Sequence, residues 1–290
     1  IMQRTLRTSG AETLCAASNI FVGLMESPLL VKPFIRGMTE SELMAVMTVG
    51  MATISGGVLA AYAGMMAPFY PAAAGHLIAA SVMSAPAAFV IAKLLIPETG
   101  KPETLGVLDV EVQGEKPDVN VIDAAARGAA EGLKLALVVG AMLIAFIALV
   151  ALANGVVGWA GSLAGFDGLS IEGMLGWVLA PVAWLLGVTW VDAGVIGQLI
   201  GVDFVLNEFV AFGQLQGLLQ GGAELQERSV VIGIYALATF ANFGSVAMTI
   251  AGLGEIAPSR RQDLARLGMK AMLAGLLAAL LTATFAGMLT

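Results

Sequence analysis

Long stretches without Asp, Glu, Lys or Arg constrain this chain more than any other feature. A helix that crosses the hydrocarbon core of a bilayer needs roughly 20 mostly apolar residues. Five uncharged stretches reach that length: 43–70, 72–92, 135–166, 229–254 and 271–290. A sixth, 173–191, contains Pro181 between glycine-rich flanks, so it either crosses the bilayer, lies along its surface or packs inside the protein. We therefore predict an all-α polytopic membrane protein.

The composition agrees with this prediction and excludes several other classes. Apolar residues make up 58% of the chain and charged residues 12%, with a mean hydropathy of +0.90, which is unusual for a soluble domain. One cysteine (Cys15) and one histidine (His76) exclude a disulfide framework and a zinc cluster. A net charge of −7 without a basic stripe argues against nucleic-acid binding.

Charged residues and prolines gather between the second and third stretches. They predict a solvated polar loop over 97–131, whose end (118–134) has the apolar spacing of an interfacial helix. A second surface helix is predicted over 258–270, where four basic residues suggest the cytoplasmic side. Because the chain opens on Ile1 without a signal-peptide pattern, we expect it to be a fragment, with a targeting segment or further membrane spans upstream.

Two apolar segments are interrupted by polar residues, and each precedes a span whose helix pattern is broken. The interrupted segments are 13–35 and 193–219, and the breaks lie at 53–57 and 240–245. Such segments at corresponding places in two halves are typical of secondary transporters with internal repeats and binding sites near the midplane. We predict two re-entrant helical hairpins and two broken transmembrane helices in internal repeats.

Glu26 and Glu208 are the first candidates for a site, because a carboxylate in an apolar segment is costly unless it is paired or faces water. The alternative is that either residue caps a turn or pairs with a surface cation. Carboxylates accept hydrogen bonds from vicinal hydroxyls, so these two residues with Asn242 and Ser245 suit a sugar-like ligand.

Neutral oxygen atoms near the first break suit a hard cation. They come from Asn19, Thr53, Ser55 and the carbonyls freed around Gly56. Ordinary packing of small residues between helices explains the same pattern equally well. His76, without a carboxylate nearby in sequence, is more typical of a packed residue than of a proton relay.

Four motifs, at Ser18–Val31, Met51–Tyr62, Val205–Phe212 and Tyr235–Ser245, resemble the concentrative nucleoside transporter family. They occur in the family's order over nearly the whole chain. The resemblance implies a homotrimeric cation–nucleoside symporter in the bacterial inner membrane, embedded in the lipid bilayer, whose transport domain moves like an elevator.

The resemblance also implies roles for individual positions. The ribose positions are Glu26, Glu208, Asn242 and Ser245, with Phe240 and Val58 near the base and sugar. The sodium positions, partly through backbone carbonyls, are Asn19, Val22, Thr53 and Ile54. It divides the chain into a first hairpin and broken helix of the transport domain (1–70), scaffold helices (71–191), a second hairpin and broken helix of the transport domain (192–255), and an interfacial helix with the last span (256–290).

One departure concerns the base. The family usually has Gly-Gln-Thr-Glu or Gly-Gln-Ser-Glu where this chain has Gly23-Leu24-Met25-Glu26. Apolar side chains discriminate mainly by shape, so Leu24 and Met25 predict a relaxed or shifted base preference.

Asn19 and Thr53 favour sodium over protons as the coupling ion. The alternatives are a proton-coupled symporter of another ribosyl or non-nucleoside solute, and a membrane-embedded enzyme with Glu26 and Glu208 as acid and base.

Overall fold

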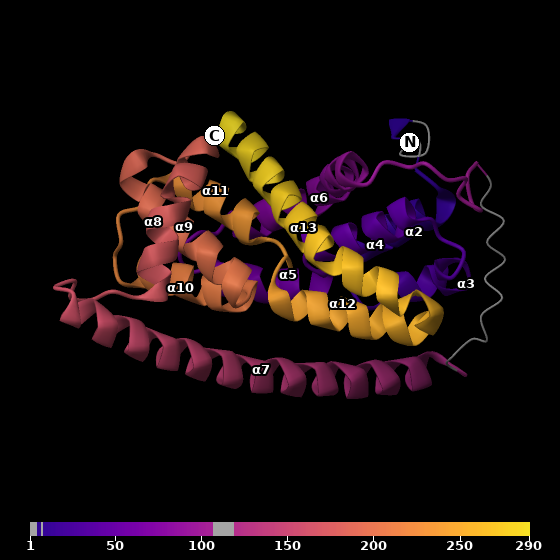
Figure 1. Ribbon diagram of the computed structural model, residues 1–290, viewed down its shortest axis with the longest axis horizontal. Coiled ribbons are helices and arrows are strands. Elements are labelled where there is room, and N and C mark those ends of the chain that lie inside the picture. Colours follow the sequence, from indigo (N-terminus) through magenta and orange to yellow (C-terminus); the bar gives the residue numbers. More distant parts are fainter. Residues whose placement is uncertain (1–4, 7, 107–118) are drawn as a thin grey trace. The chain divides into compact units, whose positions relative to one another are not determined.

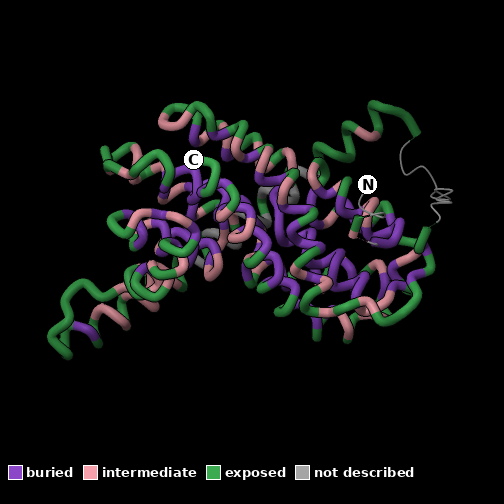
Figure 2. Tube along the Cα trace, turned by 90° about the horizontal axis from the view of Figure 1, so that it is seen from above, coloured by how far each residue is buried: buried purple, intermediate pink, exposed green. Residues whose placement is uncertain are grey.

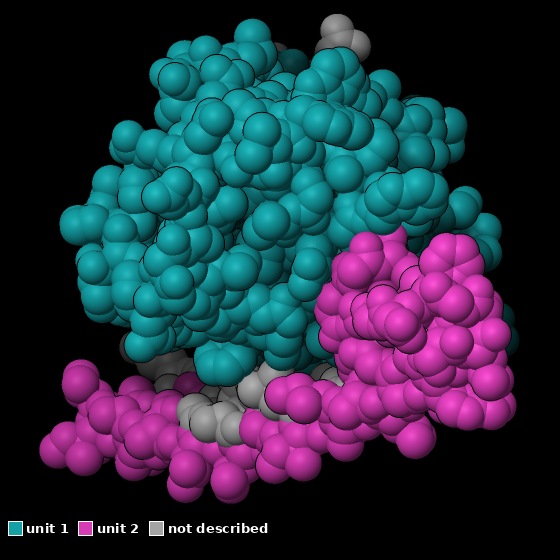
Figure 3. Space-filling model, turned by 90° about the vertical axis from the view of Figure 1, so that its left-hand side faces the viewer, with its two compact units in different colours: residues 1–108, 175–290 teal, residues 109–174 magenta. Residues whose placement is uncertain are grey.

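The computed structural model of the protein describes residues 5, 6, 8–106 and 119–290. Within these ranges the regular elements are helices, and no strand occurs among them (Figure 1). The chain divides into two compact units, which Figure 3 colours separately: Ile1–Leu108 with Leu175–Thr290, and Asp109–Met174. The prediction of an all-helical chain is therefore confirmed for the described residues.

The first part of the larger unit contains a helical hairpin, a broken helix and a long helix. Its elements are α2 (Gly10–Asn19), η1 (Ser27–Val31), α3 (Lys32–Ile35), α4 (Glu40–Ala52), α5 (Gly56–Met66) and α6 (Ala73–Leu95). Ser9 and Thr39 each begin a helix with a capping box, in which the side chain and a glutamate three residues later satisfy free backbone N–H groups. Prolines near the starts of η1 and α3 keep the second arm of the hairpin short.

The second part repeats the order of hairpin and broken helix. Its elements are α8 (Ile171–Leu185), α9 (Trp190–Val205), α10 (Glu208–Gln220), α11 (Glu227–Leu237), α12 (Phe243–Ile256), η2 (Pro258–Arg260) and α13 (Arg261–Leu289). Helix α8 begins in the smaller unit, and its remainder packs on α9, where Gly197 and Gly201 approach α8 closely. The axes of α8 and α9 differ by 117°.

The core of the larger unit lies where α13 packs against α4, α6, α11 and α12. Every residue of α4 after Glu40 is buried. Figure 2 colours the trace by burial and shows buried segments gathered in the interior. Small residues permit the close approach: a Cβ on Gly275 of α13 would lie 3.1 Å from the Cβ of Met51. Such contacts are usual between membrane helices, where close van der Waals packing replaces the hydrophobic effect.

Three described helices or helix pairs are long and apolar enough to cross a membrane: Glu40–Met66, Ala73–Leu95 and Pro258–Leu289. The bent pair of α8 and α9 would be a fourth, as a broken span or a re-entrant loop. These agree with the stretches predicted at 43–70, 72–92 and 271–290. The fourth uncharged stretch, 229–254, is not one continuous helix, because α11 ends at Leu237 and α12 begins at Phe243.

Two predicted surface segments continue into longer helices. The helical spacing predicted at the end of the polar segment 97–131 agrees with α7 (Val121–Leu163), which begins there; residues 107–118 lie outside the described chain. Asn120 caps this helix with bonds from two backbone N–H groups. The helix predicted over 258–270 is continuous with the last span, since α13 runs from Arg261 to Leu289 without interruption.

Helix α7 accounts for most of the smaller unit. Its 43 residues span about 65 Å at 1.5 Å per residue, roughly twice the hydrocarbon thickness of a bilayer. Most of the predicted interfacial segment 118–134 and of the predicted span 135–166 thus belongs to one helix, Val121–Leu163; Asp118 lies outside the described residues.

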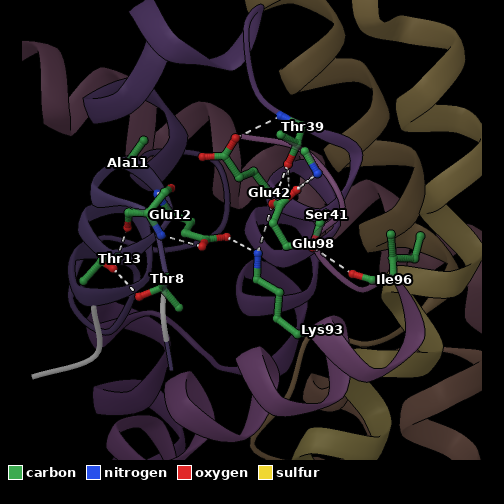
Figure 4. A network of polar contacts seen from close by, with 12 residues as sticks. Thr8, Ala11, Glu12, Thr13, Thr39, Ser41, Glu42, Lys93, Ile96 and Glu98 are labelled. Atoms are coloured by element: carbon green, nitrogen blue, oxygen red, sulfur yellow. Dashed lines mark hydrogen bonds and ion pairs between the residues drawn. The ribbon is translucent and has the colours of Figure 1, made fainter. Parts of the chain in front are cut away.

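A polar network joins α2, α4 and α6 within the larger unit (Figure 4). Lys93, in the last turn of α6, contacts buried Glu12 of α2 at 2.9 Å and Glu98 at 3.7 Å. Glu98 also accepts a hydrogen bond from the Thr39 hydroxyl at 2.7 Å. The network therefore fixes the first arm of the hairpin to the helices beside it.

Candidate functional site

The two broken helices meet at their breaks. The Phe240 N–H donates to the Met51 carbonyl at 2.8 Å, and the Thr239 hydroxyl donates to the same carbonyl at 2.7 Å. Met51 lies at the end of α4, just before the break at Thr53–Ser55. The unwound backbone of the second break is therefore bonded to the end of the first broken helix.

The turn of the first hairpin lies against the same break. The Gly56 N–H donates to the Phe21 carbonyl at 3.1 Å. Gly23 has a φ of +108°, and a Cβ on it would lie 2.8 Å from the Cβ of Ser55. Only glycine combines that backbone conformation with so close an approach, so residue 23 fixes the hairpin turn beside Ser55.

Glu208 is the best-anchored polar side chain of this region. It begins α10 and is 6% exposed. Tyr62 of α5 donates its hydroxyl proton to Oε1 at 3.1 Å, and Asn242 donates from Nδ2 to Oε2 at 3.1 Å. A buried carboxylate needs such donors, and here they come from both broken helices.

Asn242 and Ser245 form the start of α12. The Asn242 Oδ1 accepts hydrogen bonds from the Ser245 N–H at 3.0 Å and from the Ser245 hydroxyl at 3.2 Å. Asn242 is thus the N-cap of α12 and a partner of Glu208 at once. Three of the four predicted ribose positions (Glu208, Asn242 and Ser245) therefore lie in one hydrogen-bonded cluster.

Glu26, the fourth predicted ribose position, is not among the residues hydrogen-bonded in this cluster. Its side chain is exposed at the hairpin turn, and its Oε2 would be 3.1 Å from a Cβ on Gly23. No hydrogen bond joins it to Glu208 in the part of the chain that the structure describes. Phe240 and Val58 are half-buried at the two breaks.

Leu24 and Met25 fill space above two glycines. The Leu24 Cδ1 occupies the position that a Cβ on Gly50 of α4 would take, and the Met25 Cε does the same at Gly252 of α12. The apolar pair therefore packs the hairpin turn against one broken helix on each side.

The predicted sodium positions fall into two groups. Asn19 is buried, donating from Nδ2 to the Val49 carbonyl at 3.1 Å and accepting from the Ser27 hydroxyl at 3.2 Å. Thr53 and Ile54 are buried in the first break, whereas the Val22 side chain is 46% exposed. Amide, hydroxyl and carbonyl oxygens are the ligands that a hard cation prefers. Among the described residues, no group of three or more His, Cys, Asp or Glu side chains offers a different metal site.

Tyr62 is the residue that the sequence analysis missed, although it lies within one of the quoted motifs. Its ring stacks on Phe212 with centroids 4.4 Å apart. The available signal was a tyrosine in an otherwise uncharged apolar helix, since a buried phenol usually has a hydrogen-bond partner.

A family model described as the C-terminus of Na⁺-dependent nucleoside transporters matches residues 76–287. The chain belongs to the concentrative nucleoside transporter family. It is 47% identical over 287 residues to the uncharacterized transporter YutK of Bacillus subtilis, covering 99% of this chain and 69% of YutK. It is 44% identical over 290 residues to the nucleoside permease NupC of Helicobacter pylori, covering 99% of this chain and 67% of the permease.

The solved structure of the transporter CNTnw in an inward-facing substrate-bound state is also similar to this family member. The TM-score is 0.89 and the identity 46%, over 98% of this chain and 66% of that one. This member of the concentrative nucleoside transporter family thus spans about two thirds of the length of CNTnw. Because the structural match covers 98% of this chain, it includes nearly all of the helices described above.

Proposed function

We propose that the protein containing this chain is a symporter that uses a cation, sodium in the first place, to drive nucleosides across the membrane into the cell. The observation that carries the proposal is the anchoring of Glu208 between Tyr62 and Asn242, where two broken helices meet. Buried polar groups at the junction of broken helices are the usual substrate site of secondary transporters.

The substrate would bind through its ribose at the cluster of Glu208, Asn242 and Ser245. A carboxylate with an amide and a hydroxyl can accept and donate hydrogen bonds to the two ribose hydroxyls. Glu26 would complete the set from the hairpin turn, with Phe240 and Val58 beside the base and sugar. Leu24 and Met25, which pack against α4 and α12, would offer the base no hydrogen-bonding group and so weaken discrimination between bases.

Sodium would bind between the hairpin turn and the first break, at Asn19, Val22, Thr53 and Ile54. The neutral oxygens of this region suit it, and the matching family model is named for Na⁺-dependent transport. The Gly56–Phe21 hydrogen bond already joins the two segments that would share the ion.

The hairpins would be re-entrant and related by an internal repeat, in a homotrimer within a bacterial inner membrane. Segments 1–70 and 192–255 would move together as the transport domain, as in an elevator, while 71–191 would supply the scaffold. The hydrogen bonds at Met51, which join the two segments, support this proposal.

The test is uptake of labelled uridine and adenosine by cells that express the full-length protein, in sodium and in choline buffer. Glu208→Gln is compared with Glu255→Gln, which changes a carboxylate at the far end of α12. We expect sodium-dependent uptake that Glu208→Gln abolishes and Glu255→Gln retains. Absence of uptake for both nucleosides, with the protein present in the membrane, would refute nucleoside transport and require a wider panel of solutes.

A further inference from the structure

Asp203 stands out as a buried carboxylate to which the predicted transport function assigns no role. It lies in the last turn of α9 and is 0% exposed. Neither of its side-chain oxygens has a hydrogen-bond partner among the residues that the structure describes. An unpaired buried charge is among the most costly groups that a protein can contain, so its state requires an explanation.

The other buried carboxylates of the described chain all have donors. Glu12 accepts from Lys93 and the Ser9 N–H, and Glu42 accepts from the Thr39 N–H. On the same helix as Asp203, Asp192 accepts from the Thr189 hydroxyl at 3.3 Å and the Gln226 N–H at 3.1 Å. Glu208 has Tyr62 and Asn242, as described above. The missing donors at Asp203 are therefore not a general property of buried acids in this fold.

The position of Asp203 does not suit a charged carboxylate. It lies at the C-terminal end of α9, where the helix dipole is negative. A second buried acid, Glu208, begins the next helix, and the Tyr62 hydroxyl already donates its proton to Glu208.

The helices around α9 bring no compensating cation. Helix α10 carries one titratable side chain, Glu208. Helix α11 carries three: Glu227, Arg228 and Tyr235. Arg228 donates to the Gly187 carbonyl, near the opposite end of α9. Glu255, on α12, lies at the end of that helix away from the Phe204–Phe243 ring contact, and residues 175–185 of α8 carry no titratable group.

We propose that Asp203 is a proton-binding site of this transporter, next to the substrate cluster. The carboxyl group is protonated when packed as in this structure, and it releases its proton when water reaches α9. Binding forms one O–H bond on a carboxylate oxygen and breaks one O–H bond of a hydronium ion, which is left as water; release reverses both changes. A proton requires no cavity and no set of ligands, whereas a metal cation would need several oxygen ligands around it. The claim that Asp203 takes part in coupling rests on the proposed transport function. The claim that its carboxyl group is protonated does not.

The decisive experiment is infrared difference spectroscopy of the purified full-length protein with isotope-labelled aspartate, titrated from acid to alkaline pH without sodium or nucleoside. We expect a protonated-carboxyl band that shifts with the aspartate label and persists at neutral pH. The band should vanish in Asp203→Asn and remain in Asp192→Asn, the matched control on the same helix. If no label-sensitive band exists at neutral pH in the unmutated protein, Asp203 is ionised and the proposal is wrong, whether or not Asp203→Asn folds.

Uptake measurements then test the role in coupling. We expect uptake to depend on external pH in the unmutated protein and in Asp192→Asn, and this dependence to be lost in Asp203→Asn, which mimics the neutral acid. An unchanged pH profile in Asp203→Asn would overturn that role. If the unmutated protein carries no nucleoside at all, the transport proposal fails, while the infrared result still decides the proton site.

Discussion

At the scale of single residues, Glu208 depends on donors from two other helices. Tyr62→Phe removes one hydrogen bond and keeps the ring that stacks on Phe212. A hydrogen bond to a charged group contributes about 1.5 kcal/mol, so we expect uridine to bind roughly tenfold more weakly. Calorimetric titration of the purified protein measures this change.

Tyr235→Phe is the matched control for that variant. Tyr235 is buried on α11, and its ring contacts His76 at an edge. Uridine affinity should stay within twofold of the unmutated protein. Equal losses in both variants would mean that phenol removal acts through general stability and that Tyr62 does not orient Glu208.

Leu24 and Met25 define a second prediction at this scale. Leu24→Gln combined with Met25→Thr restores the polar pair that the family usually has, and we expect it to tighten the binding of uridine. Leu29→Gln, which changes an exposed side chain of η1, serves as the control. Unchanged uridine affinity in the double variant would contradict the assignment of these two residues to the base.

The sequence predicted the residues of the site better than their contacts. Glu208, Asn242 and Ser245 were recognisable because polar groups in an apolar segment are unusual. Tyr62 was not, because its partner lies 146 residues away along the chain, and no local pattern reports such a pairing. The exposure of Glu26 at the hairpin turn likewise depends on tertiary position and not on local sequence.

At the scale of elements, the first hairpin depends on the close approach at Gly23. Gly23→Ala forces an alanine into a positive φ, which costs about 1–2 kcal/mol of stability. The close contact with Ser55 costs about 1–3 kcal/mol more. Gly222→Ala is the control, because Gly222 also has a positive φ (+79°) but open space around it. We expect Gly23→Ala to lower the melting temperature more than Gly222→Ala. Equal shifts would indicate that the contact with Ser55 yields freely.

The contact between Lys93 and Glu12 provides another prediction at this scale. Lys93→Met leaves the buried Glu12 without its cation, which we expect to cost about 3 kcal/mol of stability. Lys93→Met with Glu12→Gln should recover most of that loss, since the double variant buries no unpaired charge. Thermal unfolding of the full-length protein in detergent measures both. No recovery in the double variant would show that Lys93 acts through packing.

The ends of the helices were harder to predict from the sequence than the helices themselves. The helical spacing around 118–134 was read correctly, but its continuity with the following span was not, because a change from polar to apolar composition does not end a helix. The same applies to 258–270 and α13. The breaks at 53–57 and 240–245 were predictable, since glycine and polar residues interrupt the apolar helix pattern there.

At the scale of the whole molecule, sodium and nucleoside should stabilise the protein cooperatively. A ligand at one hundred times its Kd stabilises the folded state by about 2.7 kcal/mol. Coupled sites strengthen each other by the same factor in both directions. We expect uridine to raise the melting temperature more in sodium chloride than in choline chloride. Equal shifts in both salts would contradict sodium coupling while leaving uridine binding intact.

The Met51 carbonyl has a consequence that goes beyond holding the fold together. Two groups from the second broken helix donate to this one oxygen, and Thr53 and Ile54 follow two and three residues later along the same backbone. A movement of the Phe240 N–H would act on the same carbonyl that ends the first broken helix. Because both breaks share this one acceptor atom, we expect the two unwound segments to move together and not independently.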